Sequence, residues 1–300
     1  MTARAGPSRQ PEVVLGIDAG GSSTRARAVS QGHTVHQGTG GPGNPVMADE
    51  ETIGSSYHAA LARCPRPNRV AACVSGTSDP ARRAQIERLL TGQFPDADVR
   101  VLPDYTACLM AAPAGTDICI VAGTGSVVCS QAADGTFFVT GGRGWILGDH
   151  GSAARLGRAA LEHYVSKQEP SSFADAISQL FGSSERRAVV NVVHAAPNPA
   201  PVLARAAPLL TAAAERHLPW AVRLLDEEMG ALAASAILHI EQYQTSAAQV
   251  QVALSGGVWA SHAARASLSR ALTQTAGRSV TIVRSVRDPL DGAVLLAANG

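Results

Sequence analysis

Three glycine-rich turns in this sequence could bind the phosphate groups of a nucleotide. They contain Gly20-Gly21, Gly123-Thr124-Gly125 and Gly256-Gly257, and each follows an apolar run typical of a buried strand. Such a turn presents backbone N–H groups to phosphate oxygens with no side chain in the way. One glycine turn alone is more often structural, because glycine is the common residue wherever φ is positive. Three turns in the same setting favour nucleotide binding.

Two aspartates are placed where phosphoryl transfer would need them. Asp18 ends the apolar run VVLGID before the first turn, where it could hold Mg²⁺ through water or could cap the turn. Asp104 stands before a helical segment at 105–112, where it could act as a general base or as a helix cap. The two roles of Asp104 are compatible, since the N-terminal end of a helix keeps a nearby carboxylate ionised.

Composition and missing motifs exclude several other classes of protein. The 300 residues are 45% hydrophobic and 16% charged, with 25 Lys and Arg against 24 Asp and Glu, so no strong field attracts nucleic acid or an anionic membrane. Neither a GxxxxGK[ST] loop nor a GxGxxG strand-to-helix turn is present. The five cysteines lack the spacing of a zinc site. A small-molecule partner therefore fits best.

Cysteine usage and the apolar runs predict a cytoplasmic protein. An odd number of cysteines, some inside apolar runs, is typical of a reducing compartment. Residues 1–12 have no apolar core, so they predict a loose tail and not a signal peptide. No apolar run approaches the ~20 residues that cross a bilayer, so no membrane partner is expected.

Hydrophobic periodicity predicts two similar α/β halves. Strands are expected at 13–18, 24–29, 70–74, 99–102, 118–122, 127–130, 250–254 and 280–283. Helices are expected at 49–62, 79–90, 105–112, 261–275 and 291–298, and a loop at 39–45. The region from 151 to 243 is rich in Ala, Leu and Arg with helical spacing. We expect one lobe at 13–115, with the helix at 289–300 packing back on it, and a second at 116–288 with a helical insertion at about 152–245.

Four segments carry a resemblance to a known family. LGIDAGGSSTRARAV and ICIVAGTGSVV resemble the two phosphate motifs of actin-like sugar kinases, VQVALSGGVWAS their adenosine motif, and LPDYTACLMAA their catalytic-acid motif. GGRGWILGDHGSAARLG resembles a sugar-site segment of the N-acetylglucosamine and glucosamine kinase branch, often named for the BadF/BadG/BcrA/BcrD ATPases. The resemblance runs from Val13 to Ala298. It implies an α/β fold of two actin-like (ribonuclease H-like) lobes, with mixed sheets flanked by helices and a cleft between them.

The same resemblance implies an activity and a set of contacts. The activity is ATP-dependent phosphorylation of the 6-hydroxyl of an amino sugar, with ATP and Mg²⁺ as cofactors, Asp104 as the catalytic base and Asp18 as the metal ligand. The ATP phosphates would be bound by Gly20, Gly21, Ser22, Ser23, Thr24, Gly123, Thr124, Gly125 and Ser126. Adenosine would be bound by Ser255, Gly256 and Gly257. The sugar would be bound by Asn44, Ser75, Gly76, Asp104, Gly125, Trp145, Asp149 and Ala153.

Some positions depart from the branch and leave alternatives open. Pro103 and Val127 replace side chains that relatives use near the site, so N-acetylmuramic acid, an anhydro-sugar and glucose stay possible acceptors. His150 stands where many relatives have Glu, which removes a negative charge that would favour an ammonium at C2 and so favours N-acetylglucosamine over glucosamine. Asn44 could be an ordinary loop residue, and Trp145 could serve packing alone.

The sequence bears on two alternative functions and on a possible homodimer. An ATPase activator of a dehydratase or reductase would use cysteines to bridge an iron–sulfur cluster, and no cysteine stands on a glycine-rich hinge near a helix start. A sugar-sensing regulator would need a DNA-binding module, for which the tail leaves no room. The Ala- and Leu-rich insertion leaves a homodimer open.

Overall fold

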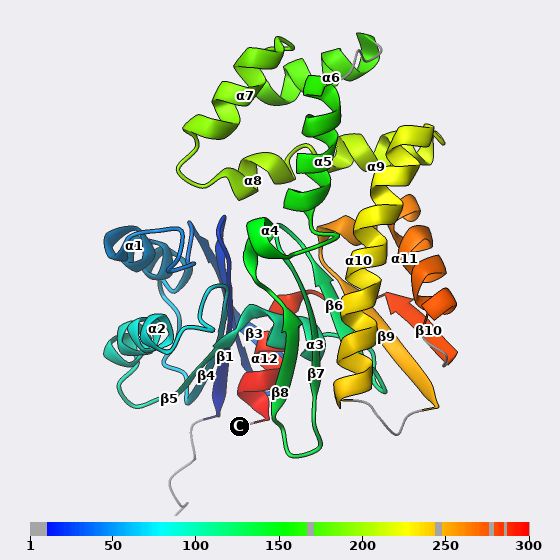
Figure 1. The fold of residues 1–300 in the computed structure, drawn as a ribbon. Helices are drawn as coiled ribbons and strands as arrows, with labels where there is room; N and C mark the ends of the chain where they lie inside the picture. Colours follow the sequence, from blue (N-terminus) through cyan, green and yellow to red (C-terminus); the bar gives the residue numbers. More distant parts are fainter. Residues whose placement is uncertain (1–10, 167–170, 244–247, 276–278, 285–286, 300) are drawn as a thin grey trace, which may run out of the picture. The chain divides into compact units, whose positions relative to one another are not determined.

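The chain folds into two compact units, each built on one five-stranded sheet. The computed structural model describes residues 11–166, 171–243, 248–275, 279–284 and 287–299. One unit comprises Met1–Ala111 and Val286–Gly300, and the other Ala112–Ser285. Both sheets contain parallel and antiparallel strands and are flanked by helices (Figure 1). The predicted α/β class with mixed sheets is confirmed.

The first sheet has the order β3-β2-β1-β4-β5. Strand β1 pairs antiparallel with β2 and parallel with β4, β2 pairs antiparallel with β3, and β4 pairs parallel with β5. The central strand is apolar and buried along most of its length, as a strand covered on both faces must be. The five strands are β1 (Val13–Ala19), β2 (Thr24–Ser30), β3 (His33–Gly40), β4 (Arg69–Val74) and β5 (Asp98–Pro103).

Four helices cover the first sheet: α1 (Glu50–Ala60), α2 (Pro80–Gln93), α3 (Asp104–Met110) and α12 (Pro289–Ala298). Leu15 and Ile17 of β1 belong to one core with residues of α1 and α2. Gly16 faces the other side of the sheet, because successive residues of a strand alternate between its two faces. A Cβ at Gly16 would lie 2.4 Å from the Val294 nitrogen of α12. The helix nearest the end of the chain therefore packs against its first strand.

The second sheet repeats this topology, with the order β10-β9-β6-β7-β8. Its central strand β6 again pairs antiparallel with the following strand β7 and parallel with a strand from much later in the chain, β9. Each sheet thus places a glycine turn between its central strand and the next. The strands are β6 (Ile118–Ala122), β7 (Ser126–Gln131), β8 (Phe137–Gly141), β9 (Gln249–Ser255) and β10 (Ser279–Arg284).

The helices of the second unit form two groups. Helices α9, α10 and α11 contribute to the core over the sheet, α6, α7 and α8 to a smaller second core, and α5 to both. Figure 1 shows where these helices lie. Between β8 and β9 lie α4 (Gly144–Leu147), α5 (Ala153–Ser166), α6 (Ser171–Phe181), α7 (Arg186–Ala195), α8 (Pro199–Ala204), α9 (Ala207–Glu215) and α10 (Pro219–Tyr243). A short 3-10 helix, η1 (Gly257–Ala260), and α11 (His262–Thr275) follow β9.

The sequence prediction missed two of the four edge strands, β3 and β8. Every residue of these two strands is exposed or half-buried, so neither has the buried apolar run of a central strand. The predicted loop at 39–45 was also wrong at its start, because Thr39 and Gly40 belong to β3. A Cβ at Gly40 would lie 1.9 Å from the Ser56 carbonyl oxygen, so this glycine permits close packing against α1 and does not break the strand.

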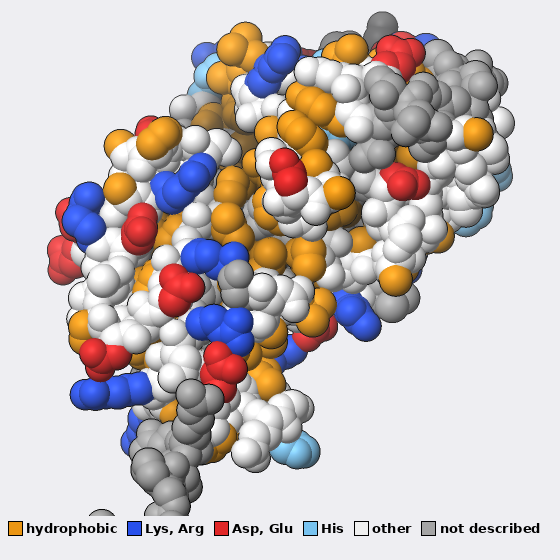
Figure 2. Space-filling view, turned by 90° about the horizontal axis from the view of Figure 1, so that it is seen from below, with side chains coloured by type: hydrophobic (Ala, Val, Ile, Leu, Met, Phe, Trp, Pro, Cys, Tyr) orange, Lys and Arg blue, Asp and Glu red, His pale blue; other side chains and the backbone are white. Residues whose placement is uncertain are grey.

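The surface carries mixed charge. On the face shown in Figure 2, acidic and basic side chains are interspersed, in line with the near-equal numbers of both in the sequence. Within the described residues, no helix combines the length and the apolarity that a membrane crossing demands.

Replacing Gly292 by alanine tests the packing of α12. A Cβ there would lie 2.0 Å from the Ala107 carbonyl oxygen of α3, so we expect Gly292→Ala to lower the free energy of unfolding by about 1–3 kcal/mol. The matched control is Gly54→Ala in α1, where a Cβ meets no described atom within 4 Å and helix propensity predicts a gain of up to about 1 kcal/mol. Urea titration measures both. A Gly292→Ala protein as stable as the control would contradict this packing.

Candidate active site

The first glycine turn is held by backbone hydrogen bonds from distant parts of the chain. The Gly20 N–H donates to the Ser23 carbonyl at 2.9 Å, and the Gly20 carbonyl accepts from the Gly43 N–H at 3.0 Å. The Ala19 carbonyl accepts from the Ser75 N–H at 2.9 Å. A Cβ added at Gly20 would meet no described atom within 4 Å, so the turn is open on that side.

The hydroxyl groups at this turn are used differently. Ser22 is exposed, whereas Thr24 is buried at the start of β2. The Thr24 Oγ1 donates to the Gly41 carbonyl at 3.0 Å. The hydrogen of Thr24 therefore fixes the loop after β3, and only its oxygen lone pairs could take part in other contacts.

Arg25 joins Asp18 to the beginning of α12. Its guanidinium forms two hydrogen bonds with Asp288, Nη1 to Oδ2 at 2.6 Å and Nη2 to Oδ1 at 2.8 Å, and an ion pair with Asp18. Two residues further along β2, Arg27 forms an ion pair with Asp291. Burial disfavours a charged guanidinium, but the hydrogen bonds with Asp288 and Asp18 outweigh it and raise the pKa of Arg25. Sequence reasoning missed this contact, because its partners lie 263 residues apart.

Asp104 is the first residue of α3. Pro103 occupies the N-cap position without a side-chain hydrogen bond, so the alternative role of Asp104 as the N-cap is wrong. Burial raises the pKa of Asp104, and the negative charge of Asp18 adds to that shift, while a hydrogen bond with Ser75 opposes it. Asp18 is the last residue but one of β1, and Ser75 and Asp104 directly follow β4 and β5. These three strands are parallel, so their carboxyl ends meet at one edge of the sheet. The structure thus brings Asp18, Ser75 and Asp104 together.

Asn44 lies against the turn after β4. It is buried, and its Oδ1 accepts from the Val46 N–H at 2.8 Å. Gly76 has a φ of 83°, and a Cβ there would come within 2.5 Å of the Asn44 Oδ1. Only glycine tolerates both the dihedral angle and the close approach. Asn44 and Gly76, both expected at the sugar, are therefore neighbours.

Tyr57 has a buried hydroxyl group beside the first turn. Its ring lies near Gly43 and Thr24, since a Cβ at Gly43 would meet Tyr57 Cε2 at 3.2 Å and Thr24 Oγ1 at 2.3 Å. The Tyr57 Oη has no hydrogen-bond partner among the described residues. Burial raises the pKa of Tyr57, so the group stays a protonated donor. A buried donor without a partner costs stability, which suits a site that receives a water or ligand oxygen.

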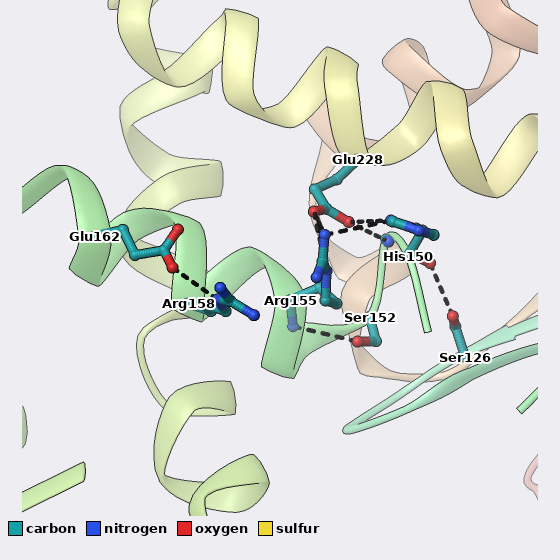
Figure 3. Close-up of polar contacts among 8 residues, drawn as sticks. Ser126, His150, Ser152, Arg155, Arg158, Glu162 and Glu228 are labelled. Carbon is teal, nitrogen blue, oxygen red and sulfur yellow. Dashed lines mark hydrogen bonds and ion pairs between the residues drawn. The ribbon is translucent and has the colours of Figure 1, made fainter. Parts of the chain in front are cut away.

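In the second unit, the start of α5 holds the second glycine turn. The Ala153 N–H donates to the Gly123 carbonyl at 2.8 Å, and the Ala154 N–H donates to the Thr124 carbonyl at 3.2 Å. Ser126 is buried, and its Oγ donates to the His150 carbonyl at 2.8 Å (Figure 3). The first N–H groups of α5 and the Ser126 hydrogen are therefore used inside the protein.

Asp149 lies next to the same turn. Its φ is 51°, which is unusual for a residue other than glycine. The Asp149 Oδ1 accepts from the Gly144 N–H at 3.1 Å, and a Cβ at Gly125 would lie 2.7 Å from Oδ2. Burial raises the pKa of Asp149, although hydrogen bonds from backbone N–H groups oppose the shift. The predicted sugar residues Gly125, Asp149 and Ala153 are thus close together in this unit.

Glu228 of α10 fixes the turn that carries Asp149. It accepts from the Arg155 Nη2 at 2.8 Å, from the Gly151 N–H at 3.1 Å, and lies 3.3 Å from the His150 Nδ1 (Figure 3). Its side chain is 12% exposed, so this carboxylate is largely removed from water. Sequence reasoning missed Glu228, because nothing in the local pattern of α10 marks it.

The last two predicted groups lie elsewhere in the second unit. Trp145 is half-buried against the core of the insertion, and the Arg158 guanidinium lies 5.9 Å from its ring centroid. Gly256 has a φ of 110°, and a Cβ there would lie 2.3 Å from the Ala122 carbonyl oxygen. Ser255 is buried at the end of β9, and Gly257 is exposed. The adenosine contacts stay predictions.

The residues around Asp18 fit a magnesium ion. Among the described residues, no three His, Cys, Asp or Glu side chains gather as a metal cluster. Mg²⁺ in nucleotide sites needs only one or two carboxylates, together with waters and phosphates. Asp18 offers a carboxylate beside a second acid, Asp104, and the unpartnered Tyr57 Oη lies near the same turn.

Comparison with known proteins assigns the chain to a family. The BadF/BadG/BcrA/BcrD ATPase family model matches residues 15–297. An α/β protein with two repeated sheets and paired glycine turns is expected for this class of ATPase. The chain belongs to the BadF/BadG/BcrA/BcrD ATPase family, as the resemblance implied. No curated protein matches the chain significantly.

Solved structures share the fold. A candidate N-acetylglucosamine kinase from Porphyromonas gingivalis is 21% identical with a TM-score of 0.78, covering 96% of this chain and 99% of that one. A candidate N-acetylglucosamine kinase from Chromobacterium violaceum is 25% identical with a TM-score of 0.71, covering 96% and 99%. A ROK family glucokinase from Streptomyces griseus, in complex with glucose and AMPPNP, is 18% identical with a TM-score of 0.60, covering 96% and 100%.

Replacing Asp104 by asparagine should stabilise the protein near neutral pH. Because the pKa of Asp104 is raised in the folded state, its ionised form destabilises the fold as pH rises above the ordinary carboxyl range near ~4. Asp104→Asn should therefore melt at a higher temperature than the wild type at pH 7–8, and the gain should vanish in acid. The control is Asp49→Asn, because a hydrogen bond with Thr52 lowers the pKa of Asp49 and its loss gives no gain. The melting temperatures of the wild type and both variants are measured across pH. An Asp104→Asn protein that melts below the wild type at neutral pH would refute the effect of burial on Asp104.

Proposed function

We propose that this chain is an ATP-dependent sugar kinase that phosphorylates the 6-hydroxyl of an amino sugar, with N-acetylglucosamine preferred over glucosamine as the acceptor. The observation that carries the proposal is the buried Asp104, with its raised pKa, beside Asp18 at the carboxyl ends of three parallel strands. Membership of an ATPase family supports the use of ATP. The similar structures, two candidate N-acetylglucosamine kinases and a glucokinase with bound glucose and AMPPNP, support a sugar acceptor.

The nucleotide would be held mainly by backbone groups. In this proposal the N–H groups of Gly21, Thr124 and Gly125 bind phosphate oxygens, and exposed Ser22 and Thr124 add hydroxyl groups. The N–H groups of Gly20 and Gly123 donate to the Ser23 and Gly125 carbonyls, so these two glycines would line the turns. Asp18 would hold Mg²⁺, which supplies charge neutralisation at the phosphates. The buried hydrogens of Thr24 and Ser126 are used within the protein, so these two residues would shape the turns.

Asp104 would act as the general base. Its carboxylate accepts the proton of the acceptor hydroxyl as the new oxygen–phosphorus bond forms, and the bond between the γ-phosphorus and the bridging oxygen breaks to release ADP. A raised pKa makes Asp104 a better proton acceptor than an ordinary aspartate, because a stronger base favours proton transfer. Ser75, which donates a hydrogen bond to Asp104, would orient the carboxylate.

The surroundings of His150 support an acetylated acceptor. No carboxylate stands at position 150, and the nearby Glu228 is already paired with the Arg155 guanidinium at 2.8 Å. Its charge is therefore matched inside the protein and does not favour an ammonium group. A neutral acetamido group at C2 fits these surroundings better than the free amine of glucosamine.

Loss of the base should abolish turnover while ATP still binds. We expect Asp104→Asn to lower kcat for N-acetylglucosamine by about 10²–10⁴, since a general base contributes that range. A coupled assay of ADP formation over a panel of hexoses and amino sugars measures turnover, and calorimetry with Mg-ATP measures binding. Asp79→Asn is the matched control, because Asp79 caps α2 of the same unit and pairs only with Arg82 of that helix among the described residues. Undiminished turnover in Asp104→Asn would disprove the assignment, and no turnover of any sugar by the wild type would disprove the function.

A further inference from the structure

The helical insertion of the second unit contains a cavity of about 500 Å³. Residues of α4, α5, α7 and α8 line it. Its floor is apolar, because Leu161, Val189 and Leu203 are at most 5% exposed. Pockets of about 300–1,000 Å³ with mostly apolar walls are typical of small-molecule sites. None of the roles proposed above accounts for a cavity of this size.

The two oppositely charged side chains that line the cavity pair with each other, and His194 lines it as well. Arg158 and Glu162 line it, and they pair with each other at 2.7 Å between Nε and Oε1 (Figure 3). The Arg158 guanidinium also lies 5.9 Å from the ring centroid of Trp145, another lining residue. Because this ion pair is internally balanced, the cavity offers little to an ionic ligand and suits an apolar group.

The cavity is connected to the predicted sugar segment through two elements. Trp145 directly follows Gly144, whose N–H donates to the Asp149 carboxylate at 3.1 Å. Helix α5 starts at Ala153 and carries Leu161 about 12 Å further along its axis. A sugar bound at Asp149 and Ala153 would therefore have Trp145 and the cavity beside it in the same unit.

Apolar side chains next to the cavity are uncovered. Ile146, which lines it, is 67% exposed, and the adjacent Leu147 is 81% exposed. Exposed apolar groups around a hollow are common where a ligand covers them. An acetyl group has only three heavy atoms, and one water molecule takes about 30 Å³ of liquid volume. Three atoms of about that size fill only a small part of the cavity, so an acetyl group alone would leave most of it empty.

We propose that the cavity receives the acyl chain of an N-acyl amino sugar whose chain is longer than acetyl. The inference rests on the proposed function and names the substrate class of that same site. The sugar ring would be held at Asp149, and the chain would pass Trp145 and bury its methylenes against Leu161 and Leu203. The free energy of that burial would add to the binding of the acceptor.

A chain-length series tests the inference. Glucosamine carrying N-acetyl, N-butanoyl and N-hexanoyl groups is assayed with Mg-ATP, and kcat/KM is compared. Each buried methylene strengthens binding about threefold to fourfold. The kcat/KM value should therefore rise about tenfold for every two methylenes added to the chain. A profile that is flat or falls with chain length overturns the inference.

Two neighbouring valines of α7 provide a matched pair of variants. Val193 lines the cavity, so Val193→Trp should fill it and bring the ratio of hexanoyl to acetyl kcat/KM down toward one. Val192 does not line it and is 38% exposed, so Val192→Trp should keep the wild-type ratio. If Val193→Trp fails to fold, Val190→Trp fills the same cavity from the same helix. Equal ratios in the lining and control variants would refute the assignment.

The experiments distinguish a failure of the acyl-chain inference from a failure of the proposed kinase function. A wild-type protein that phosphorylates N-acetylglucosamine but gains nothing from longer chains keeps the proposed function and loses the inference. A protein that phosphorylates none of the series, and also no free amino sugar or hexose, loses both. Direct calorimetric titration with N-hexanoylglucosamine, without nucleotide, should show tighter binding than N-acetylglucosamine and does not depend on turnover.

Discussion

The bridge from Arg25 to Asp18 and Asp288 is the interaction on which the first unit depends. It ties the end of the first strand to the first turn of the last helix, whose N-cap is Asp288. Without the guanidinium, two carboxylates would stand near one another uncompensated, and Asp104 would face the unscreened charge of Asp18. A residue of an early strand thus sets the charge balance around the proposed base, and the chain must be folded to its last helix to complete it.

Both units solve the same problem with the same topology. Each glycine turn lies between a central strand and its antiparallel neighbour, and each is fixed by N–H groups from later segments, Gly43 in one unit and Ala153 in the other. Backbone hydrogen bonds therefore hold the turns, while the glycines keep the approach free of side chains. The hydroxyls of Thr24 and Ser126 bond carbonyls of neighbouring loops and so serve the shape of the turns.

Central strands and their turns could be predicted from sequence, because apolar runs ending in glycine are local signals. Strand β6 lies where its apolar run predicts it, while the edge strand β3 was missed because it has no buried residue and is defined by its pairing with β2. Arg25, Tyr57 and Glu228 escaped for another reason. The role of each depends on neighbours that are distant in sequence, as that of Glu228 depends on Arg155, 73 residues away. The roles of the site residues named by motif thus stay predictions, and the residues that position them were missed.

The helical insertion is the part of the fold where substitutions could change which ligand binds while the packing of the sheet is kept. Helices α5 to α8 share a smaller core, and α5 also contributes Leu156 and Ala160 to the core over the second sheet. Substitutions around Leu161 or Val189 would reshape the cavity while the packing of β6 and β9 stays intact. The turn that carries Asp149 is meanwhile locked from the other side by Glu228 of α10. Because function resides in sites placed on a fold, an insertion with a second core beside a turn held by Glu228 is a natural place to determine which acceptor binds.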